Sequence, residues 1–203
     1  MNKLKFWLLA NALLFSLMST LAQAQSSVRV RGAITAFDGQ VLAVKTRDGK
    51  DLQAKVTDET GVSNMYSLQV GDIKPGSFVG VTAIRKGPER RMYALEVHIF
   101  PEDLRGMGEG HRDWDLEPES TMTNANVDAI VERNDGKELT LSYKGGQQQI
   151  IVTPDTPVVS FSPADKSLLK AGAQVFFVAR PSADGGLTAQ RIQVGKGGMK
   201  PPM

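Results

Sequence analysis

The sequence predicts an all-β fold made of two related small β-barrels joined by an irregular acidic connection. Three observations predict it. Short strand patterns recur along the chain, the first half of the chain is echoed in the second, and residues 99–125 carry neither a helical nor a strand period. We call residues 99–125 the strap. Gly106, Gly108 and Gly110 alternate within it, which is unfavourable for regular structure.

The strand patterns predict five strands in each half. Val28, Val30 and Ile34 are separated by polar or small residues, the alternation of a half-buried strand. Asp-Gly and Gly-Gly pairs mark hairpin turns. We expect third strands at 52–57 and 148–153, fourth strands at 78–85 and 174–180, and closing strands at 92–99 and 186–194.

A single short helix is expected between the third and fourth strands of the second half. Ser162 would cap it, Pro163 would occupy its first turn and Gly172 would end it. Three strands, a short helix or loop and two further strands is the order of an OB-like barrel. The predicted fold is therefore two tandem small OB-like β-barrels, with SH3-like closure as the alternative.

The internal repeat fixes the predicted domain boundaries. The run Val56–Val62 matches Val152–Val158, and three further matches follow at an offset that drifts only from 97 to 95 residues. Residues 28–98 and 126–194 should therefore superpose. The predicted organisation is a signal peptide at 1–24, a first β-repeat module at 25–98, the strap at 99–125, a second module at 126–195 and a flexible tail at 196–203.

The first 24 residues read as a secretory signal. Lys3 and Lys5 precede a mostly apolar run, and Ala22-Gln23-Ala24 is a small-x-small cleavage site. We therefore expect a periplasmic or secreted protein without a membrane span in its mature chain. An uncleaved N-terminal anchor is the alternative.

Composition narrows the possible functions. Without Lys3 and Lys5 the chain carries 22 basic and 22 acidic residues, which argues against a general nucleic-acid binder. The absence of cysteine excludes disulfides, zinc–thiolate sites and cysteine nucleophiles. No nucleophile elbow, phosphate loop or metalloprotease motif is present, so we expect no enzyme activity.

A family resemblance follows from four motifs. They are Val-x-Gly-x-Ile, Asp-Gly-x-x-Leu-x-Val, Val-x-Asp-x-Thr-x-Val and Leu/Ile-x-x-Gly-x-x-Val. The chain resembles an exported bacterial family of unknown function with tandem OB-like repeats. Its strap and tail resemble a subgroup sometimes labelled as metal-transporter permeases, a label that a chain without membrane spans does not support. The resemblance implies no catalytic residues.

The strap suggests a metal site. Imidazole and carboxylate groups suit zinc, copper or nickel, and a Met107 thioether would suit copper. The two histidines are 13 residues apart, which is not a recognised ligand spacing, so purely structural roles are the alternative. The candidate ligands of this divalent transition metal are His98, His111, Glu109, Asp113 and Asp115.

A second set of residues suggests a protein partner. Trp114 is an aromatic residue within an acidic loop, and basic residues cluster at the turn between the last two strands of the first repeat. The partner-binding candidates are Trp114, Arg85, Lys86, Arg90 and Arg91. The leading hypothesis is a non-catalytic periplasmic binding or assembly module with a protein partner and no nucleic acid. The alternative is a periplasmic divalent-metal-binding accessory protein.

Overall fold

The computed structural model describes residues 27–203, and the predicted signal peptide lies outside them. The all-β prediction is confirmed, since the regular structure consists of strands and a few one-turn 3-10 helices. Within the described residues, no helix has the length and apolar character needed to cross a membrane. The strands are β1 (Val28–Phe37), β2 (Val41–Thr46), β3 (Asp51–Lys55), β4 (Gly61–Leu68), β5 (Phe78–Lys86), β6 (Arg91–Ile99), β7 (Gly110–Asp113), β8 (Thr121–Arg133), β9 (Gly136–Tyr143), β10 (Gly146–Val152), β11 (Val158–Ala164), β12 (Gln174–Pro181) and β13 (Leu187–Gly195). The 3-10 helices are η1 (Val70–Asp72), η2 (Glu102–Leu104), η3 (Lys166–Leu168) and η4 (Lys196–Gly198).

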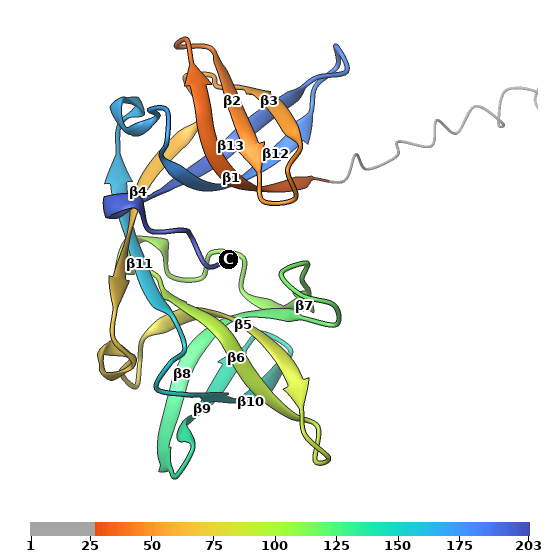
Figure 1. Ribbon diagram of the computed structural model, residues 1–203. Helices are drawn as coiled ribbons and strands as arrows, with labels where there is room; N and C mark the ends of the chain where they lie inside the picture. Colours follow the sequence, from red (N-terminus) through yellow and green to blue (C-terminus); the bar gives the residue numbers. More distant parts are fainter. Residues whose placement is uncertain (1–26) are drawn as a thin grey trace, which may run out of the picture.

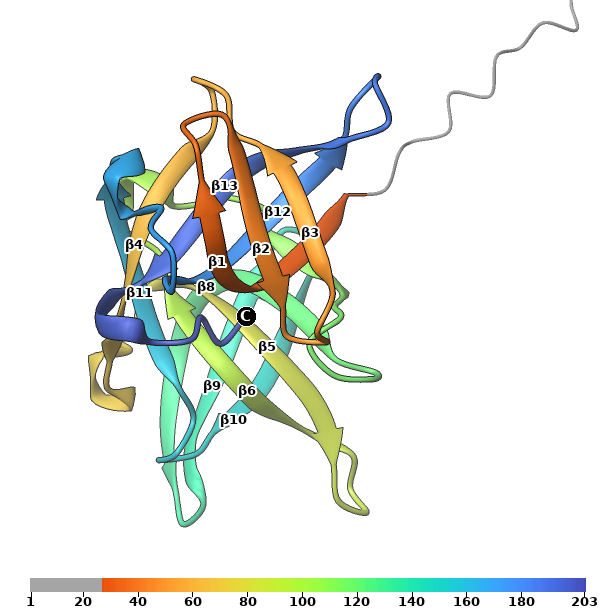
Figure 2. The same ribbon diagram turned by 45° about the horizontal axis from the view of Figure 1, so that its top comes forward.

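Two groups of five strands form two lobes (Figures 1 and 2). In the first lobe β3, β2, β1, β12 and β13 pair in that order, and β13 pairs back to β3 in parallel. In the second lobe β10, β9, β8, β5 and β6 pair in that order, and β6 pairs back to β10 in parallel. In each lobe, the pairings therefore return to the strand from which they started.

The two repeats exchange their last hairpins. The first repeat contributes β1–β3 to the first lobe but β5 and β6 to the second lobe, whereas the second repeat does the reverse. This pairing differs from our expectation that each repeat closes on itself. The repeat pattern is compatible with both arrangements, because equivalent hairpins present equivalent faces and the sequence pattern does not say which copy they complete.

Two strands that the sequence analysis missed connect the lobes. β4 and β11 lie where only a longer crossing was expected, and they pair with each other antiparallel. β4 also pairs in parallel with β13 of the first lobe, and β11 with β6 of the second. This central pair makes the two lobes one continuous sheet.

The prediction of a short helix that begins at Ser162 and Pro163 is wrong in its position and length. Both residues belong to β11, and only the single turn of η3 follows, capped by Asp165, whose side chain accepts from the Ser167 N–H. Proline is tolerated in the strand because β11 pairs with β6 only at Val158–Ser160. At Pro163 the strand has a partner on one side only, so the missing N–H interrupts no second ladder.

Each lobe has its own apolar core, and each core contains residues of both repeats. In the first lobe Val30 and Leu42 pack with Phe177 and Ile192, which come from the other end of the chain. In the second lobe Val81 and Val97 similarly pack with residues 126–152. The hydrophobic contribution of each core, about 25 cal/mol per Å² of buried apolar surface, therefore depends on both halves of the chain.

The C-terminal segment is packed and does not form the flexible tail that we expected. It crosses between the lobes, where Figure 1 places the C-terminus. Met203 is only 3% exposed, and its main-chain oxygen accepts a hydrogen bond of 2.5 Å from Arg31 Nε. Arg47 donates to the carbonyl of Pro201. Two arginines of the first lobe thus satisfy main-chain acceptors of a segment that has no strand partner.

Candidate ligand-binding cavity

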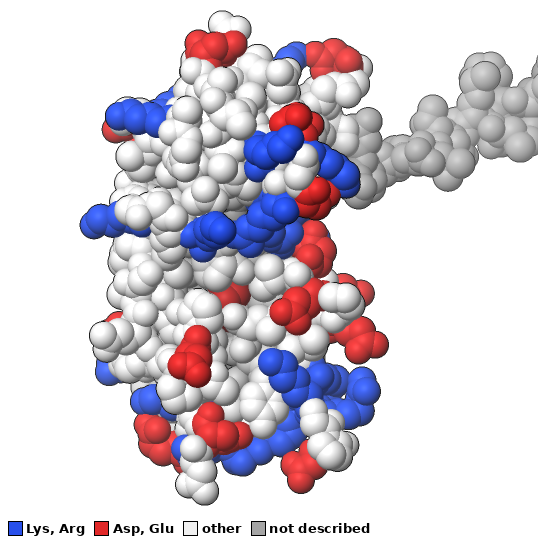
Figure 3. Space-filling view, in the orientation of Figure 1, with Lys and Arg blue, Asp and Glu red and all other residues white. Residues whose placement is uncertain are grey.

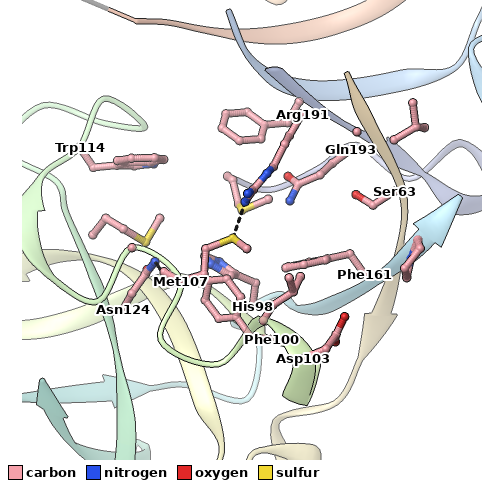
Figure 4. A pocket seen from close by; sticks show the side chains of 18 of the residues that line it. Ser63, His98, Phe100, Asp103, Met107, Trp114, Asn124, Phe161, Arg191 and Gln193 are labelled. Atoms are coloured by element: carbon pink, nitrogen blue, oxygen red, sulfur yellow. Dashed lines mark hydrogen bonds between the residues drawn. The ribbon is translucent and has the colours of Figure 1, made fainter. Parts of the chain in front are cut away.

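A cavity of about 410 Å³ lies between the lobes, at the level of the strap and the C-terminal segment (Figure 4). Its walls come from β4, β6, β8, β11, β12 and β13 together with the strap and Met203. Its size falls within the roughly 300–1,000 Å³ typical of small-molecule sites. Seven of the residues that line it carry aromatic or thioether side chains: Phe100, Phe161, Phe176, Trp114, Met107, Met122 and Met203.

One wall of the cavity is an aromatic cluster. The rings of Phe78 and Phe100 lie 5.1 Å apart, and those of Phe100 and Phe161 lie 5.6 Å apart, edge to face. The His98 ring meets Phe100 at 4.8 Å, also edge to face. Such geometry contributes about 0.5–1.5 kcal/mol per pair beyond area burial, so this wall is well ordered.

His98 is held by a buried carboxylate. Glu96 is 0% exposed, accepts a 2.6 Å hydrogen bond from the Thr82 hydroxyl, and lies 3.3 Å from His98 Nδ1. Glu96 and His98 are two residues apart on β6, so their side chains share one face of the strand. Gly80 of β5 makes the arrangement possible, because a Cβ there would lie 2.0 Å from His98 Nε2.

Three buried polar atoms around the cavity lack a hydrogen-bond partner within residues 27–203. They are Trp114 Nε1, Asn124 Oδ1 and Gln193 Oε1. The orientation of the Asn124 amide is fixed because its Nδ2 donates to the Met107 carbonyl at 3.0 Å. Each unpaired buried group costs about 1–3 kcal/mol. Because these atoms have almost no accessible surface, a ligand that supplied one acceptor and two donors would reach them through small movements of the wall side chains.

The strap is ordered and contacts both lobes. Arg105 donates to the Asn126 side chain and the Gly76 carbonyl, and β7 pairs with β8 of the second lobe. Asp115 reaches the first lobe, where it forms ion pairs with Arg31 at 2.8 Å and Arg29 at 3.5 Å. Burial acts to raise the pKa of Asp115, but the hydrogen bond from Arg31 and the charges of Arg31 and Arg29 together lower it below the ordinary value.

An aromatic residue in an acidic loop, such as Trp114, is most simply expected to anchor that loop on the protein surface, with its N–H bound to an acceptor. Its half-buried ring does pack between the lobes, with the Arg29 guanidinium 3.9 Å above the ring centroid. Its N–H, however, has no acceptor among the described residues, which corrects that part of the prediction. The ring therefore holds the strap through cation–π and apolar contacts, and it leaves a donor free beside the cavity.

We predict that Trp114→Ala loosens the strap. Because the ring is only partly buried, the loss should be about 2 kcal/mol, less than the 3–5 kcal/mol of a fully buried aromatic. Limited proteolysis should cut between Gly106 and Gly110 faster than in the unmodified protein. Val131→Ala, at a 55% exposed position, is the control and should leave cleavage unchanged. Equal cleavage rates in all three proteins would contradict the anchoring role.

Four of the five predicted metal ligands have other partners, and the fifth, Asp113, is exposed. His111 Nδ1 lies 2.8 Å from the Thr123 hydroxyl, the Lys144 N–H donates to Glu109, and Asp115 pairs with arginines. Burial, followed by the charge of Arg85, lowers the pKa of His111 below 6.5. Across residues 27–203 the structure brings together no group of three or more His, Asp or Glu side chains able to hold a metal ion.

The predicted partner-binding residues lie close together. Arg85, Lys86, Arg90 and Arg91 flank the turn between β5 and β6, and Figure 3 shows basic side chains gathered at this end of the second lobe. Arg91 is paired with Glu138. Arg85 and Arg90 line a shallow depression with Trp114 and Asp113, so the turn and the strap form one continuous surface.

Most residues of the cavity carry no sequence signal. Asn124, Gln193 and Arg191 lie on ordinary strands, and no motif sets them apart from other polar strand residues. Met203 lies in the C-terminal segment, which was predicted to be a flexible tail. Only His98, Met107 and Trp114 were recognised as candidates.

Comparison with known proteins finds one family match to part of the chain and leaves the function open. Residues 128–193 match a family described as a domain of unknown function, DUF5666. No curated protein matched the chain, and neither did any solved structure. The matched segment runs from β8 into β13, so it contains strands of both lobes. By fold and site, the chain is an all-β protein with an apolar cavity between two lobes, and its second repeat is similar to DUF5666.

Proposed function

We propose that this protein is a non-catalytic binding protein, exported to the periplasm, whose cavity between the lobes holds a small molecule with an apolar body. Three unpaired buried polar atoms around a largely apolar cavity carry the proposal. Native interiors pair such groups, so three at one cavity indicate a missing partner. The predicted signal sequence supports export, and the absence of a catalytic motif supports binding without chemistry.

The closure of each lobe is the subject of a second proposal. We propose that each lobe is an OB-like barrel, completed by a hairpin from the other repeat. The pairing order within each lobe supports this, with one parallel contact between the third and last strands. Under this proposal the ligand site lies between two barrels, on strands and loops from both repeats.

Metal binding has weaker support. Met107, Met122 and His98 would offer soft and borderline ligands, but the guanidinium of Arg191 contacts the Met107 sulfur. A fixed positive charge at that thioether disfavours a cation there. We therefore expect the cavity to bind an organic molecule, and not the transition metal suggested by the strap.

Titration with N-phenyl-1-naphthylamine tests the proposal. This neutral probe becomes fluorescent on leaving water, and Trp114, the only tryptophan in residues 25–203, would report its approach by quenching. We expect saturable binding of one probe per chain. Gly61→Phe should weaken binding at least ten-fold, because Gly61 lines the cavity and a Cβ there faces only Arg191 Cγ at 3.8 Å.

Gly71→Phe is the matched control. Gly71 is exposed, does not line the cavity, and has open space where a Cβ would be added. It should leave the affinity unchanged, and both variants should keep the circular dichroism spectrum of the unmodified protein. Absence of saturable binding, or equal affinity in Gly61→Phe and the unmodified protein, would overturn the proposal.

A further inference from the structure

The charges of the cavity wall are unbalanced. Two arginines, Arg112 and Arg191, line the cavity against one acid, Asp103. Neither arginine forms an ion pair with Asp103 or with any other carboxylate in residues 27–203. Arg191 is exposed and Arg112 is partly buried, so water solvates both charges and no protein carboxylate occupies their donors within the described residues. Both guanidinium groups are therefore available to a ligand in the cavity.

Arg191 is the more exposed of the two arginines. It lies on β13, and Figure 4 shows its side chain running into the cavity towards Met107. Its single side-chain hydrogen bond within the described residues goes to the Met107 sulfur, a weak acceptor. Most of the N–H donors of this guanidinium therefore have no strong acceptor within the described residues. Gln193, two residues further along the same strand, lines the same wall.

Arg112 enters from the strap. Its Nη1 donates to the Gly108 carbonyl at 2.8 Å, and its guanidinium lies 5.7 Å from the Trp114 ring centroid. Burial, and then the charge of Arg29, lower the pKa of Arg112 below its ordinary value, as expected for a cation short of a counter-charge. Arg29 and Arg31 differ from it, because both share Asp115.

The remaining polar atoms fit the same pattern. Trp114 Nε1 is a third unused donor at this cavity, whereas Asn124 Oδ1 and Gln193 Oε1 are unused acceptors. An acidic group would accept from the guanidinium and indole donors. The rings of Phe100 and Phe161 and the Met122 side chain offer no hydrogen-bond partners, so they suit the apolar remainder of the molecule.

We infer that the ligand of this cavity is an amphipathic organic anion, an aromatic or alkyl body bearing a carboxylate or sulfonate that binds Arg191 and Arg112. The planar guanidinium matches such an oxyanion with two parallel N–H donors. The inference rests on the proposed function, because it assigns a ligand class to the same site. A hydroxyl or amide on the ligand would satisfy Asn124 and Gln193.

Two probes with one aromatic body test the inference. 8-Anilinonaphthalene-1-sulfonate is N-phenyl-1-naphthylamine with a sulfonate added, so the ratio of their affinities isolates the contribution of the anion. We expect the sulfonate to bind the unmodified protein at least ten-fold more tightly than the neutral probe. Arg191→Gln and Arg112→Gln should each reduce that ratio several-fold, and because the ratio compares two probes in the same variant, a general change of the cavity wall cancels from it.

Arg180→Gln, at an exposed position on β12 away from the cavity wall, is the matched control and should leave the ratio unchanged. Gly61→Phe should weaken both probes, which separates binding in the cavity from adsorption elsewhere. Equal affinities for the two probes in the unmodified protein would overturn the anion assignment and leave the proposed function standing. If Arg180→Gln also lowered the ratio of the two affinities, the anion assignment would again be overturned. Failure of both probes to bind would instead remove the proposed function itself.

Discussion

Phe177→Ala should destabilise the protein by about 3–5 kcal/mol and should loosen strands far away in the sequence. Phe177 is 0% exposed, and its ring packs in the core that contains β1, β2 and β3. The stated loss is that of a buried aromatic truncated to alanine. Urea unfolding would measure it. Hydrogen exchange should show the loss of protection in β1–β3, although Phe177 itself belongs to the second repeat.

Leu141→Ala is the matched control. Leu141 is also fully buried and also belongs to the second repeat, but it packs in the core of the second lobe. Its truncation should cost about 2–5 kcal/mol and should reduce protection mainly in β5, β6 and β8–β10. If Phe177→Ala instead loosened β8–β10 and spared β1–β3, the hairpin exchange would be wrong.

Cutting the chain in the strap should leave one particle. A site-specific protease sequence inserted between Pro118 and Glu119, both exposed, would divide the chain into its two repeats. We expect the fragments to co-elute in size-exclusion chromatography without denaturant. Each lobe needs strands from both fragments, and β4 pairs with β11 across them as well. Separating the fragments would therefore expose both cores at once.

Phe177→Ala provides the comparison within the same experiment. The cut variant should dissociate at a lower urea concentration when it also carries this substitution, because the first lobe then holds its exchanged hairpin less tightly. Two independently eluting folded fragments would show that each repeat closes on itself. That result would restore the arrangement expected from the repeat alone.

The strands of each repeat could be predicted because each has a local cause. Alternating apolar residues and turn signals place β3, β10, β5, β12, β6 and β13 within a few residues of their observed bounds, whereas β8 begins at Thr121, inside the predicted strap. Which strand each of them pairs with is not determined by the local sequence. Whether β1 pairs with β5 or with β12 depends on how the chain crosses between the lobes, and two similar hairpins fit either place.

The site was predictable only where unusual residue types mark it. His98 and Trp114 attracted attention because histidine and tryptophan are rare in this chain, and both line the cavity. Arg191 and Gln193 resemble any polar residues on a half-buried strand. Their importance arises from what surrounds them, an apolar wall with a single carboxylate, and that environment is assembled from segments distant in sequence.

The exchanged hairpins also govern how this chain can fold. Val28 pairs with Ala179, and Phe78 pairs with Asn126, so each lobe is completed only by pairing between segments that are distant in sequence. Folding slows as the contacting residues move further apart in sequence, because loop-closure entropy is lost before the contacts form. The first repeat is synthesised earlier. Until the second repeat is available, β1–β3 and the β5–β6 hairpin lack the strands with which they pair in the folded protein. A chain that crosses a membrane before folding would emerge with those strand edges open, and it would depend on rapid arrival of the second repeat to escape aggregation.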